Sequence, residues 1–460
     1  MDDDWAQQTQ NLLIQPEGII ATQNSSLNLA DLNGSNGFAV NGIEDHDFSG
    51  FSVSDAGDIN NDGIDDLIIG AHHANPNGKN EAGESYVVFG GTTVGANGTL
   101  ELSAMDGSNG FVIHGIDATD HSGISVSNGG DINNDGIDDL IIGADKANPN
   151  GNQSAGESYV VFGGTTVGDN GTLELSSLDG SNGFVINGIK ASDSSGYSVS
   201  NGGDINNDGI DDLIIGAQYA DPNGKNQAGE SYVVFGGSTV GANGTLELSA
   251  LDGSNGFVIN GIKAKDNSGI SVSNGGDINN DGIDDLIIGA PYADPKDKNA
   301  AGASYVVFGD TNVGVGGTLE LSSLNGSNGF LINGIDRIDF SGYSVSHAGD
   351  INADGIDDLI IGAYRANNQV GESYVVFGGT TVGVNGTLDL SALDGSNGFV
   401  INGVDTGDYF GYSVSYAGDI NHDQIDDLII GARNAGANGN NNTGASYVLF
   451  GRPQIGASGS

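Results

Sequence analysis

The sequence predicts an all-β fold: a closed β-propeller of six four-stranded antiparallel blades, sealed by pairing of its N- and C-terminal strands, with seven blades as the alternative. An aspartate-rich loop recurs six times, starting at Asp58, Asp131, Asp204, Asp277, Asp350 and Asp419. The first five copies are spaced by 73 residues and the last interval is 69. The 80 glycines and few prolines favour short strands joined by tight turns. A repeat of this kind indicates one ring or solenoid.

Each unit contains four short strands. In the first unit we expect them at residues 38–41 (strand D), 51–54 (strand A), 67–71 (strand B) and 85–89 (strand C). Strands B and C are continuous apolar runs, which indicates a sheet that is covered on both faces. Four short antiparallel strands that repeat around an axis form a propeller.

The order of the strands predicts how the ring closes. The repeat begins at residue 26 with a D strand and ends after a C strand at residues 446–450. We therefore expect residues 38–41 to pair with residues 446–450, because this leaves no unpaired edge. One domain is expected at residues 26–452, flanked by an N-terminal tail at residues 1–25 and a C-terminal linker at residues 453–460.

The aspartate-rich loop has the donor pattern of a calcium site. In its first copy, side-chain oxygens at loop positions 1, 3, 5 and 9 come from Asp58, Asn60, Asp62 and Asp66, with the carbonyl of Ile64 at position 7. Ca²⁺ takes about six to eight oxygen ligands. Position 12 belongs to the apolar run of strand B, which excludes an EF-hand. We therefore expect a calcium loop that joins two strands, and about six Ca²⁺ in all.

The same donors recur in the other five loops. They are Asp131, Asn133, Asp135, Ile137 and Asp139; Asp204, Asn206, Asp208, Ile210 and Asp212; Asp277, Asn279, Asp281, Ile283 and Asp285; Asp350, Asn352, Asp354, Ile356 and Asp358; and Asp419, Asn421, Asp423, Ile425 and Asp427. The aspartate at position 8, Asp65 in the first loop, is expected to bond neighbouring backbone. Gln424 replaces the glycine of the sixth loop, where we expect a strained turn and weaker binding.

The composition excludes several functions. With 61 acidic and 12 basic residues the formal charge is −49, which repels nucleic acid and anionic membranes. There is no cysteine, so thiol chemistry and disulfides are excluded. No apolar run is long enough to cross a bilayer, so direct membrane insertion is not expected.

A candidate ligand face follows from the loops that differ between units. These are the D–A loop (residues 43–50 in the first unit) and the B–C loop (residues 72–83), which strand alternation places opposite the calcium loops. Eleven of the twelve basic residues lie in these two loop sets. The candidates just after strand B are His72, His73, Lys146, Tyr219, Tyr292, Tyr364, Arg365 and Arg433. Lysine also avoids acidic loops and buried strands for purely structural reasons, and that alternative stays open.

The chain resembles the FG-GAP repeats of integrin α-subunit propellers and their bacterial relatives. The resemblance rests on Phe51–Val53, Gly57–Asp58, the aspartate-rich loop and Asp66–Ala71. It covers residues 26–451. It implies a calcium-stabilised propeller that mediates adhesion or binds a protein or glycan at a surface, in an extracellular or cell-surface protein. We expect a monomeric domain. The integrin members have seven blades with calcium in only some, so six units are a departure.

Three other functions were weighed against adhesion. Loop aromatics such as Tyr219, Tyr292 and Tyr364 also suit a carbohydrate-binding propeller, and the module could be a structural spacer of a large surface protein. No Gly-x-Ser-x-Gly turn with triad partners is present, and no histidine recurs at one position in every unit. The sequence therefore predicts no catalytic residues and no enzyme.

Overall fold

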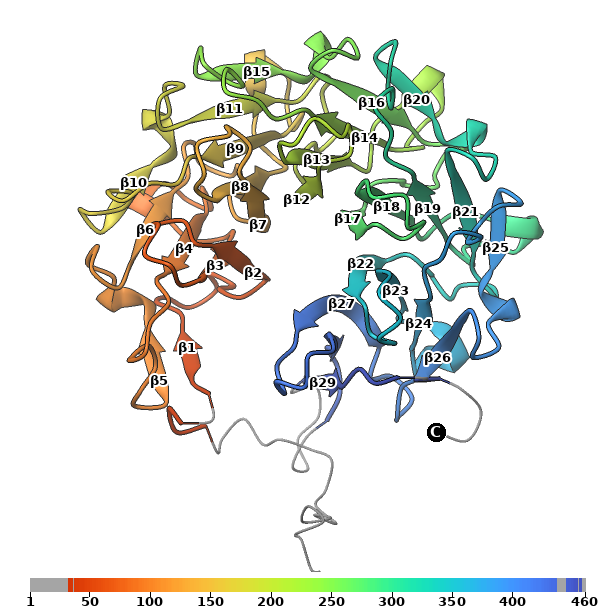
Figure 1. Cartoon of the computed structure of the whole chain (residues 1–460). Coiled ribbons are helices and arrows are strands. Elements are labelled where there is room, and N and C mark those ends of the chain that lie inside the picture. The colour runs from red at the N-terminus through yellow and green to blue at the C-terminus, as the bar shows by residue number, and fades with distance from the viewer. Residues whose placement is uncertain (1–31, 36, 437–443, 454, 457–460) are drawn as a thin grey trace, which may run out of the picture.

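The computed structural model describes residues 32–35, 37–436, 444–453 and 455–456. The strands are arranged as six blades around a common centre (Figure 1), so the predicted all-β propeller is confirmed. The predicted tail at residues 1–25 lies outside the described residues. Among the described residues, no helix is long and apolar enough to span a membrane.

The four strand types of the repeat follow the predicted order, with bounds that differ by a few residues. The A strands are β2 (Ser52–Gly57), β7 (Ser125–Gly130), β12 (Ser198–Gly203), β17 (Ser271–Gly276), β22 (Ser344–Gly349) and β27 (Phe410–Gly418). The B strands are β3 (Asp66–Ala71), β8 (Asp139–Ala144), β13 (Asp212–Ala217), β18 (Asp285–Ala290), β23 (Asp358–Ala363) and β28 (Asp427–Ala432). The C strands are β4 (Glu84–Val88), β9 (Glu157–Val161), β14 (Glu230–Val234), β19 (Ala303–Val307), β24 (Glu372–Val376) and β29 (Ala445–Leu449). The D strands are β1 (Ala39–Asn41), β6 (Gly110–His114), β11 (Gly183–Asn187), β16 (Gly256–Asn260), β21 (Gly329–Asn333) and β26 (Gly398–Asn402).

A short additional strand, which was not predicted from the sequence, occurs five times: four copies are the fifth strand of a blade, and the other pairs with β1. These strands are β5 (Thr99–Glu101), β10 (Thr172–Glu174), β15 (Thr245–Glu247), β20 (Thr318–Glu320) and β25 (Thr387–Asp389), all in C–D connections. Each pairs in parallel with the D strand of the preceding unit; for example, Thr172 of β10 lies opposite Val112 of β6. In the first four blades, the four antiparallel strands therefore gain a parallel partner that comes from the next unit.

Short helical turns complete the connections. The B–C loops contain η2 (Pro76–Gly78), η4 (Pro149–Gly151), η6 (Pro222–Gly224), η8 (Pro295–Asp297) and α1 (Ala366–Gln369). The C–D connections contain η3 (Leu102–Ala104), η5 (Leu175–Ser177), η7 (Leu248–Ala250), η9 (Leu321–Ser323) and η10 (Leu390–Ala392).

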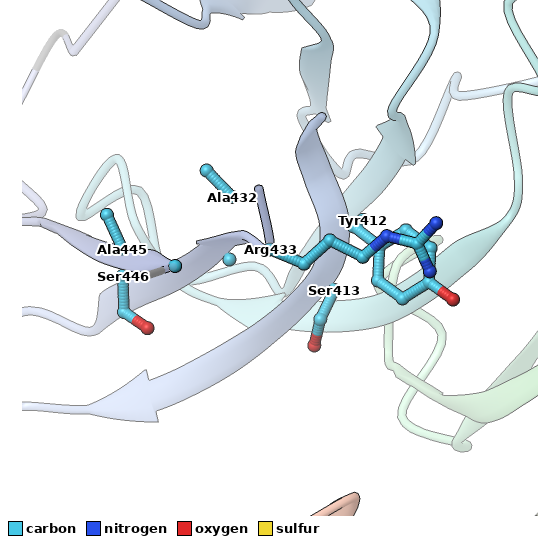
Figure 2. Close-up of a pocket in the computed structure, with 8 residues that line it drawn as sticks. Tyr412, Ser413, Ala432, Arg433, Ala445 and Ser446 are labelled. Carbon is cyan, nitrogen blue, oxygen red and sulfur yellow. The ribbon is translucent and has the colours of Figure 1, made fainter. Parts of the chain in front are cut away.

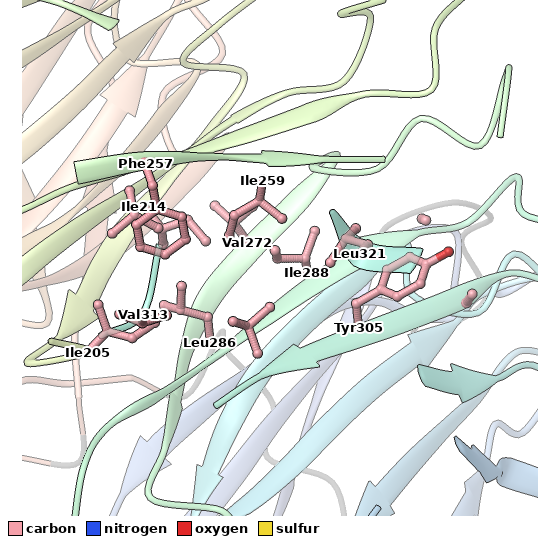
Figure 3. Packing of buried hydrophobic residues seen from close by; sticks show 14 of the residues in the cluster. Ile205, Ile214, Phe257, Ile259, Val272, Leu286, Ile288, Tyr305, Val313 and Leu321 are labelled. Carbon is pink, nitrogen blue, oxygen red and sulfur yellow. The ribbon is translucent and has the colours of Figure 1, made fainter. Parts of the chain in front are cut away.

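The hydrophobic core is divided into clusters that lie between consecutive blades. Between the third and fourth blades, Ile214 and Val233 of one blade pack with Val272, Leu286 and Ile288 of the next (Figure 3). All five side chains are at most 5% exposed. Because both faces of an inner blade are covered in this way, strands B and C are apolar throughout, as the sequence analysis inferred.

The first and last blades are not paired with each other in this structure. The sheet of β27, β28 and β29 has three strands, and β1 pairs only with β5 in a two-stranded sheet. The arc is open between these two sheets (Figure 1). The predicted pairing of residues 38–41 with residues 446–450 thus stays a prediction.

Candidate calcium loops and ligand face

Each aspartate-rich loop is held by its first aspartate. Asp58 accepts hydrogen bonds from the backbone N–H of Asp62 (2.8 Å) and of Gly63 (2.8 Å) through its two carboxylate oxygens. The same pair of bonds recurs in all six loops, and in the sixth loop Asp419 accepts from Asp423 and Gln424. The repeated donor spacing therefore produces the same folded turn in every unit.

The aspartate at position 9 joins the loop to the end of strand C. Asp66 accepts a hydrogen bond from the N–H of Gly90 (2.7 Å), and the equivalent bond recurs in the other five units. These carboxyls are almost fully buried. Burial raises the pKa of Asp66 to about 6 and that of Asp139 to about 8, because the charged form loses its hydration. A bound cation would reverse this penalty.

The donor set fits a hard cation. The Oδ1 atom of Asn60 and the Oδ2 atom of Asp139 are buried without any hydrogen-bond partner, and both belong to predicted ligands. Unpaired buried oxygens are costly, and a Ca²⁺ ion would satisfy them. As the side chains stand, no three histidine or acidic residues of the described chain are gathered closely enough to hold a metal ion. Binding would therefore require the carboxylates of one loop to turn toward a common point.

The aspartate at position 8 links neighbouring blades. Asp138 accepts a hydrogen bond at 2.9 Å from the N–H of Asp58, which begins the loop of the preceding blade. Asp211, Asp284, Asp357 and Asp426 make the same bond to the blade before them. The inference that this position bonds backbone is confirmed at these five interfaces.

Two positions of the loop have left-handed backbone. Gln424 has φ of 70°, close to the 88° of Gly63, so a non-glycine residue does occupy the strained turn, as predicted. The residue at position 4 is also left-handed, for example Asn61 at 57°. The left-handed backbone at position 4 was not predicted, although asparagine recurs there and is the residue that tolerates this backbone best after glycine.

The D–A and B–C loops meet at the opposite ends of the strands. The N–H of His73 donates to the carbonyl of Asp47 (3.3 Å), and that of Tyr219 donates to Asp193 (3.3 Å). Equivalent bonds join Lys146 to Asp120 and Arg365 to Asp339. The predicted ligand-face candidates therefore do share one end of the molecule.

A histidine cluster occupies this face at the first two blades. His72, His73 and His121 have ring centroids 4.4–5.7 Å apart, and Phe51 contacts His72 at 4.5 Å. His72 is only 6% exposed. Burial, followed by the neighbouring histidines, lowers its pKa to about 4, so the ring is neutral at physiological pH. His72 therefore serves packing more than it offers a surface to a ligand.

An aromatic cluster occupies the same face at the last three blades. Tyr343 packs on Tyr364 and Tyr412 with ring centroids 4.7 Å and 4.9 Å apart, and its hydroxyl lies 2.9 Å from that of Tyr412. Phe340 stacks on Tyr364 at 5.7 Å. Of the predicted candidates, Tyr292, Tyr364, Arg365 and Arg433 lie in or beside this cluster. Phe340, Tyr343, Tyr409 and Tyr412 were missed, although each lies in or just after a variable D–A loop.

The lysines of this face behave differently from its arginines. Lys146 pairs with Asp145 (2.9 Å), Lys296 with Asp389 (2.6 Å) and Lys298 with Asp336 (3.4 Å). These three lysines are therefore held in ion pairs within the protein, and the structural alternative for the basic residues stays open. Of the tyrosine candidates on this face, Tyr219 and Tyr292 are accessible to a ligand, because 38% and 42% of their surface is exposed.

Comparison with known families matches the calcium loops together with the strands around them. A family model for the FG-GAP repeat matches residues 51–88, 122–161, 195–234, 268–307, 341–376 and 410–449, about half of the chain. The chain belongs to the FG-GAP repeat family.

Proteins that are similar in sequence to this FG-GAP chain include integrin α-subunits. It is 30% identical to integrin alpha-PS2 of Drosophila melanogaster over 189 residues, which are 40% of this chain and 12% of the relative. It is 29% identical to integrin alpha pat-2 of Caenorhabditis elegans over 260 residues, 55% of this chain and 19% of the relative. It is 34% identical to a phosphatidylinositol-glycan-specific phospholipase D of Dictyostelium discoideum over 166 residues, 35% of this chain and 17% of the relative. The chain thus spans less than a fifth of the length of each of these relatives.

The FG-GAP units share one further feature that the sequence analysis did not identify. A buried aspartate recurs in the D–A loop, at Asp47, Asp120, Asp193, Asp266 and Asp339. Burial is the main cause that raises the pKa of each, to about 7 for Asp193, where Glu230 adds to the increase and Lys190 opposes it. The signal was an aspartate at a constant distance before each A strand.

This aspartate predicts a pH dependence of stability. Between the ordinary carboxyl pKa near 4 and a value of about 7, folded Asp193 keeps a proton that the unfolded chain has lost, so the free energy of unfolding falls as pH rises through this window. Asp193→Asn should therefore raise the melting temperature at pH 8 by about 3 °C, or roughly 3 kcal/mol, and leave it nearly unchanged at pH 4. Thermal melts at both pH values measure this. Exposed Asp169→Asn is the control, and an equal effect of both substitutions would contradict the burial argument.

Proposed function

We propose that this FG-GAP protein is a calcium-binding, integrin-α-like propeller module of a secreted or cell-surface protein. It binds a protein or glycan through the face opposite the calcium loops and has no catalytic role. One observation carries the proposal: six loops with the same oxygen donors fold identically, with buried donor oxygens left unpaired in some of them. Calcium would neutralise the buried position-9 carboxylates and fix the turn from which strand B starts.

Calcium titration tests the proposal. Calorimetry should find about six sites, of which the sixth is about fivefold weaker, because roughly 1 kcal/mol of strain at Gln424 opposes the bound turn. Gln424→Gly should bring that site to the affinity of the others and raise the melting temperature in calcium. As the matched change, Gly355→Gln should weaken the fifth site by a similar factor. If neither substitution alters calcium binding, the left-handed turn does not limit affinity; if no calcium binds at all, the proposed function is wrong.

We also propose that the ring closes by docking of the first blade on the sixth. Three contacts recur at each of the five inner interfaces: the position-8 bond described above, a bond from Val126 N–H to Ser52 Oγ (3.0 Å), and a bond from Gly164 N–H to the carbonyl of Ile59 (2.8 Å). The equivalent groups of the sixth blade are Asp419, Ser413 and Ile420. On closure they would meet Asp65, Val53 and Gly91.

The exposed apolar residues at the two ends of the arc support this closure. On the first blade Val53 is 65% exposed, whereas its equivalent Val126 is 4% exposed. On the sixth blade Val448 is 45% exposed and Ile429 is 38% exposed, whereas the equivalent residues of the inner blades are fully buried. The two faces are the two halves of an interface that the chain already forms five times.

The sixth blade has a surface hollow where the D–A loop of the first blade would dock on closure. It measures about 290 Å³ and is lined by residues that include Ser413, Gly431 and Gly444 (Figure 2). In the inner blades, a Cβ atom at the equivalents of Gly431 and Gly444 would collide with carbonyls of the next D–A loop; at Gly70 and Gly83 these carbonyls belong to Gly123 and Ser122. Residues 49–50 of the first blade would therefore fill the part of this hollow that lies at Gly431 and Gly444.

The register of the strand pairs in the first blade predicts how β1 and β29 would pair if the ring closes. In the first blade Glu84 of β4 lies opposite His114 of β6. The same register would place Ala445 of β29 opposite Asn41 of β1, so that the three-stranded and two-stranded sheets together form one five-stranded blade. This would confirm the pairing that the sequence predicts.

The alternatives to adhesion are separated by direct binding measurements. A glycan array and a panel of protein-coated surfaces, both probed with the domain in calcium, distinguish a carbohydrate-binding module from a protein-binding one. Loss of binding in a Tyr219→Ala/Tyr292→Ala variant would assign the ligand to this face. Because one relative is named a phospholipase D, a hydrolase screen that includes phospholipid substrates tests the proposal that the chain is not an enzyme.

A further inference from the structure

Two arginines of the ligand face lie against tyrosine rings. We define the arginine–tyrosine patch as Tyr364, Arg365, Tyr409, Tyr412 and Arg433, contributed by the fifth and sixth blades. The guanidinium carbon of Arg433 lies 4.0 Å from the ring centroid of Tyr412, and Figure 2 shows the side chain extended along that ring. Both guanidinium carbons approach Tyr409, at 6.0 Å for Arg365 and 5.5 Å for Arg433. The patch therefore holds two positive charges near one shared aromatic ring, that of Tyr409.

Neither arginine has a counter-charge. Within the described ranges, no carboxylate oxygen lies within 4.0 Å of a nitrogen of Arg365 or Arg433, although the chain has 61 acidic residues. The Nε atom of Arg365 is buried and has no hydrogen-bond partner. Three lysines of the same face, in contrast, are paired with aspartates. The rings hold the guanidinium groups by cation–π contact. Arg433 is exposed and can present its N–H edge to a ligand, whereas half-buried Arg365 can present only its terminal N–H groups.

This arrangement is that of a binding site for an anion. Two nearby like charges repel each other, and a bound anion converts that repulsion into two attractions. Guanidinium N–H groups match a carboxylate in pairs, which gives directional recognition. Of the patch tyrosines, Tyr364 is buried, whereas Tyr409 and Tyr412 are half-buried. These two place rings and hydroxyls beside the charges, where a ligand with a ring of C–H groups can pack.

We propose that the arginine–tyrosine patch binds a carboxylate-bearing sugar, such as a uronic acid residue of a polysaccharide. The inference rests on the proposed function, because it specifies the ligand of the same face. A uronic acid carries its carboxylate on a rigid ring, so one residue presents both the anion and the flat face that the patch accepts. An acidic peptide would place flexible carboxylates on the guanidinium groups and leave the tyrosine faces without a stacking partner.

Calorimetric titration of the full chain with trigalacturonic acid tests the proposal, at constant free calcium. The acid should bind, and its methyl ester, which has the same rings without the charge, should bind at least about tenfold more weakly. Arg365→Gln/Arg433→Gln should weaken binding of the acid by a similar factor. Lys190→Gln/Lys263→Gln is the matched control, because it removes the same charge from the same face at other blades, and it should leave the affinity unchanged. Melting temperatures in calcium verify that both variants are folded.

Three results would overturn the inference. Equal binding of the methyl ester would show that the carboxylate is not recognised, and equal weakening by the lysine control would show only general charge attraction. Tighter binding of hexa-aspartate than of trigalacturonic acid would assign the patch to acidic peptides. If none of these probes binds while calcium titration still finds about six sites, the ligand class is wrong and the calcium-binding proposal stands.

Discussion

Gly431→Ala is expected to lower the free energy of unfolding by about 3 kcal/mol or more, about as much as Gly216→Ala. In the third blade, a Cβ atom on Gly216 would lie 2.0 Å from the carbonyl oxygen of Gly269, which is backbone and cannot rotate away. Around Gly431 the nearest atom is 3.5 Å away and belongs to Ser413 of the same blade. The two substitutions have the same cost only if another segment covers Gly431, as the first blade would after docking.

Urea unfolding of both variants in calcium measures this difference. If Gly431→Ala leaves stability within about 0.5 kcal/mol of the parent while Gly216→Ala destabilises, the sixth blade is not covered and the ring is open. Size-exclusion chromatography completes the test. If Gly431→Ala destabilises the protein and also dissociates a dimer, a second copy covers the sixth blade and intramolecular closure is excluded.

Chelation of calcium is expected to produce the largest loss of stability. If six independent sites bind only the folded state, and free Ca²⁺ is ten times the dissociation constant, each site contributes about 1.4 kcal/mol and the six together roughly 8 kcal/mol. The physical reason is that calcium would satisfy the buried carboxyls at position 9, which otherwise lie in the core without hydration or a counter-charge. Thermal melts with and without chelator measure the loss, and a shift of less than a few degrees would contradict the proposed role of calcium.

A single-loop variant provides the control for chelation. Asp208→Ala removes one predicted ligand in the third blade, so it should cost about 1.4 kcal/mol in calcium and reduce the effect of chelator by the same amount. Asp169→Ala, outside any loop, should change neither quantity.

The repeat allowed most of the fold to be predicted because it aligns the chain with itself. Strand order, the folded turn of the aspartate-rich loop and the backbone role of position 8 followed from residues that return in register, such as Asp65 and its equivalents. The fifth strand was missed because its three-residue Thr-Leu-Glu segment has too few residues to show alternation. Its pairing is also long-range, so no local pattern reveals it.

The ligand face was harder to predict because its residues do not repeat. His72 was a candidate by position, yet it is buried among Phe48, Phe51 and His121, contacts that depend on how two loops fold together. Tyr409 and Tyr412 were missed for the opposite reason. They lie beside the apolar start of strand β27, where an aromatic residue looks like core, and only the three-dimensional arrangement shows that they support arginines from two blades.

The fifth strand also determines when each blade can be finished during synthesis. The D strand β6 receives its parallel partner from β10, which begins at Thr172, opposite Val112. A growing chain that has just left the ribosome as far as β6 therefore has an unpaired outer edge until sixty more residues have followed. Because the second to fifth units each supply the strand that covers the edge of the unit before them, folding of these blades can advance from the N-terminus with one exposed edge at a time.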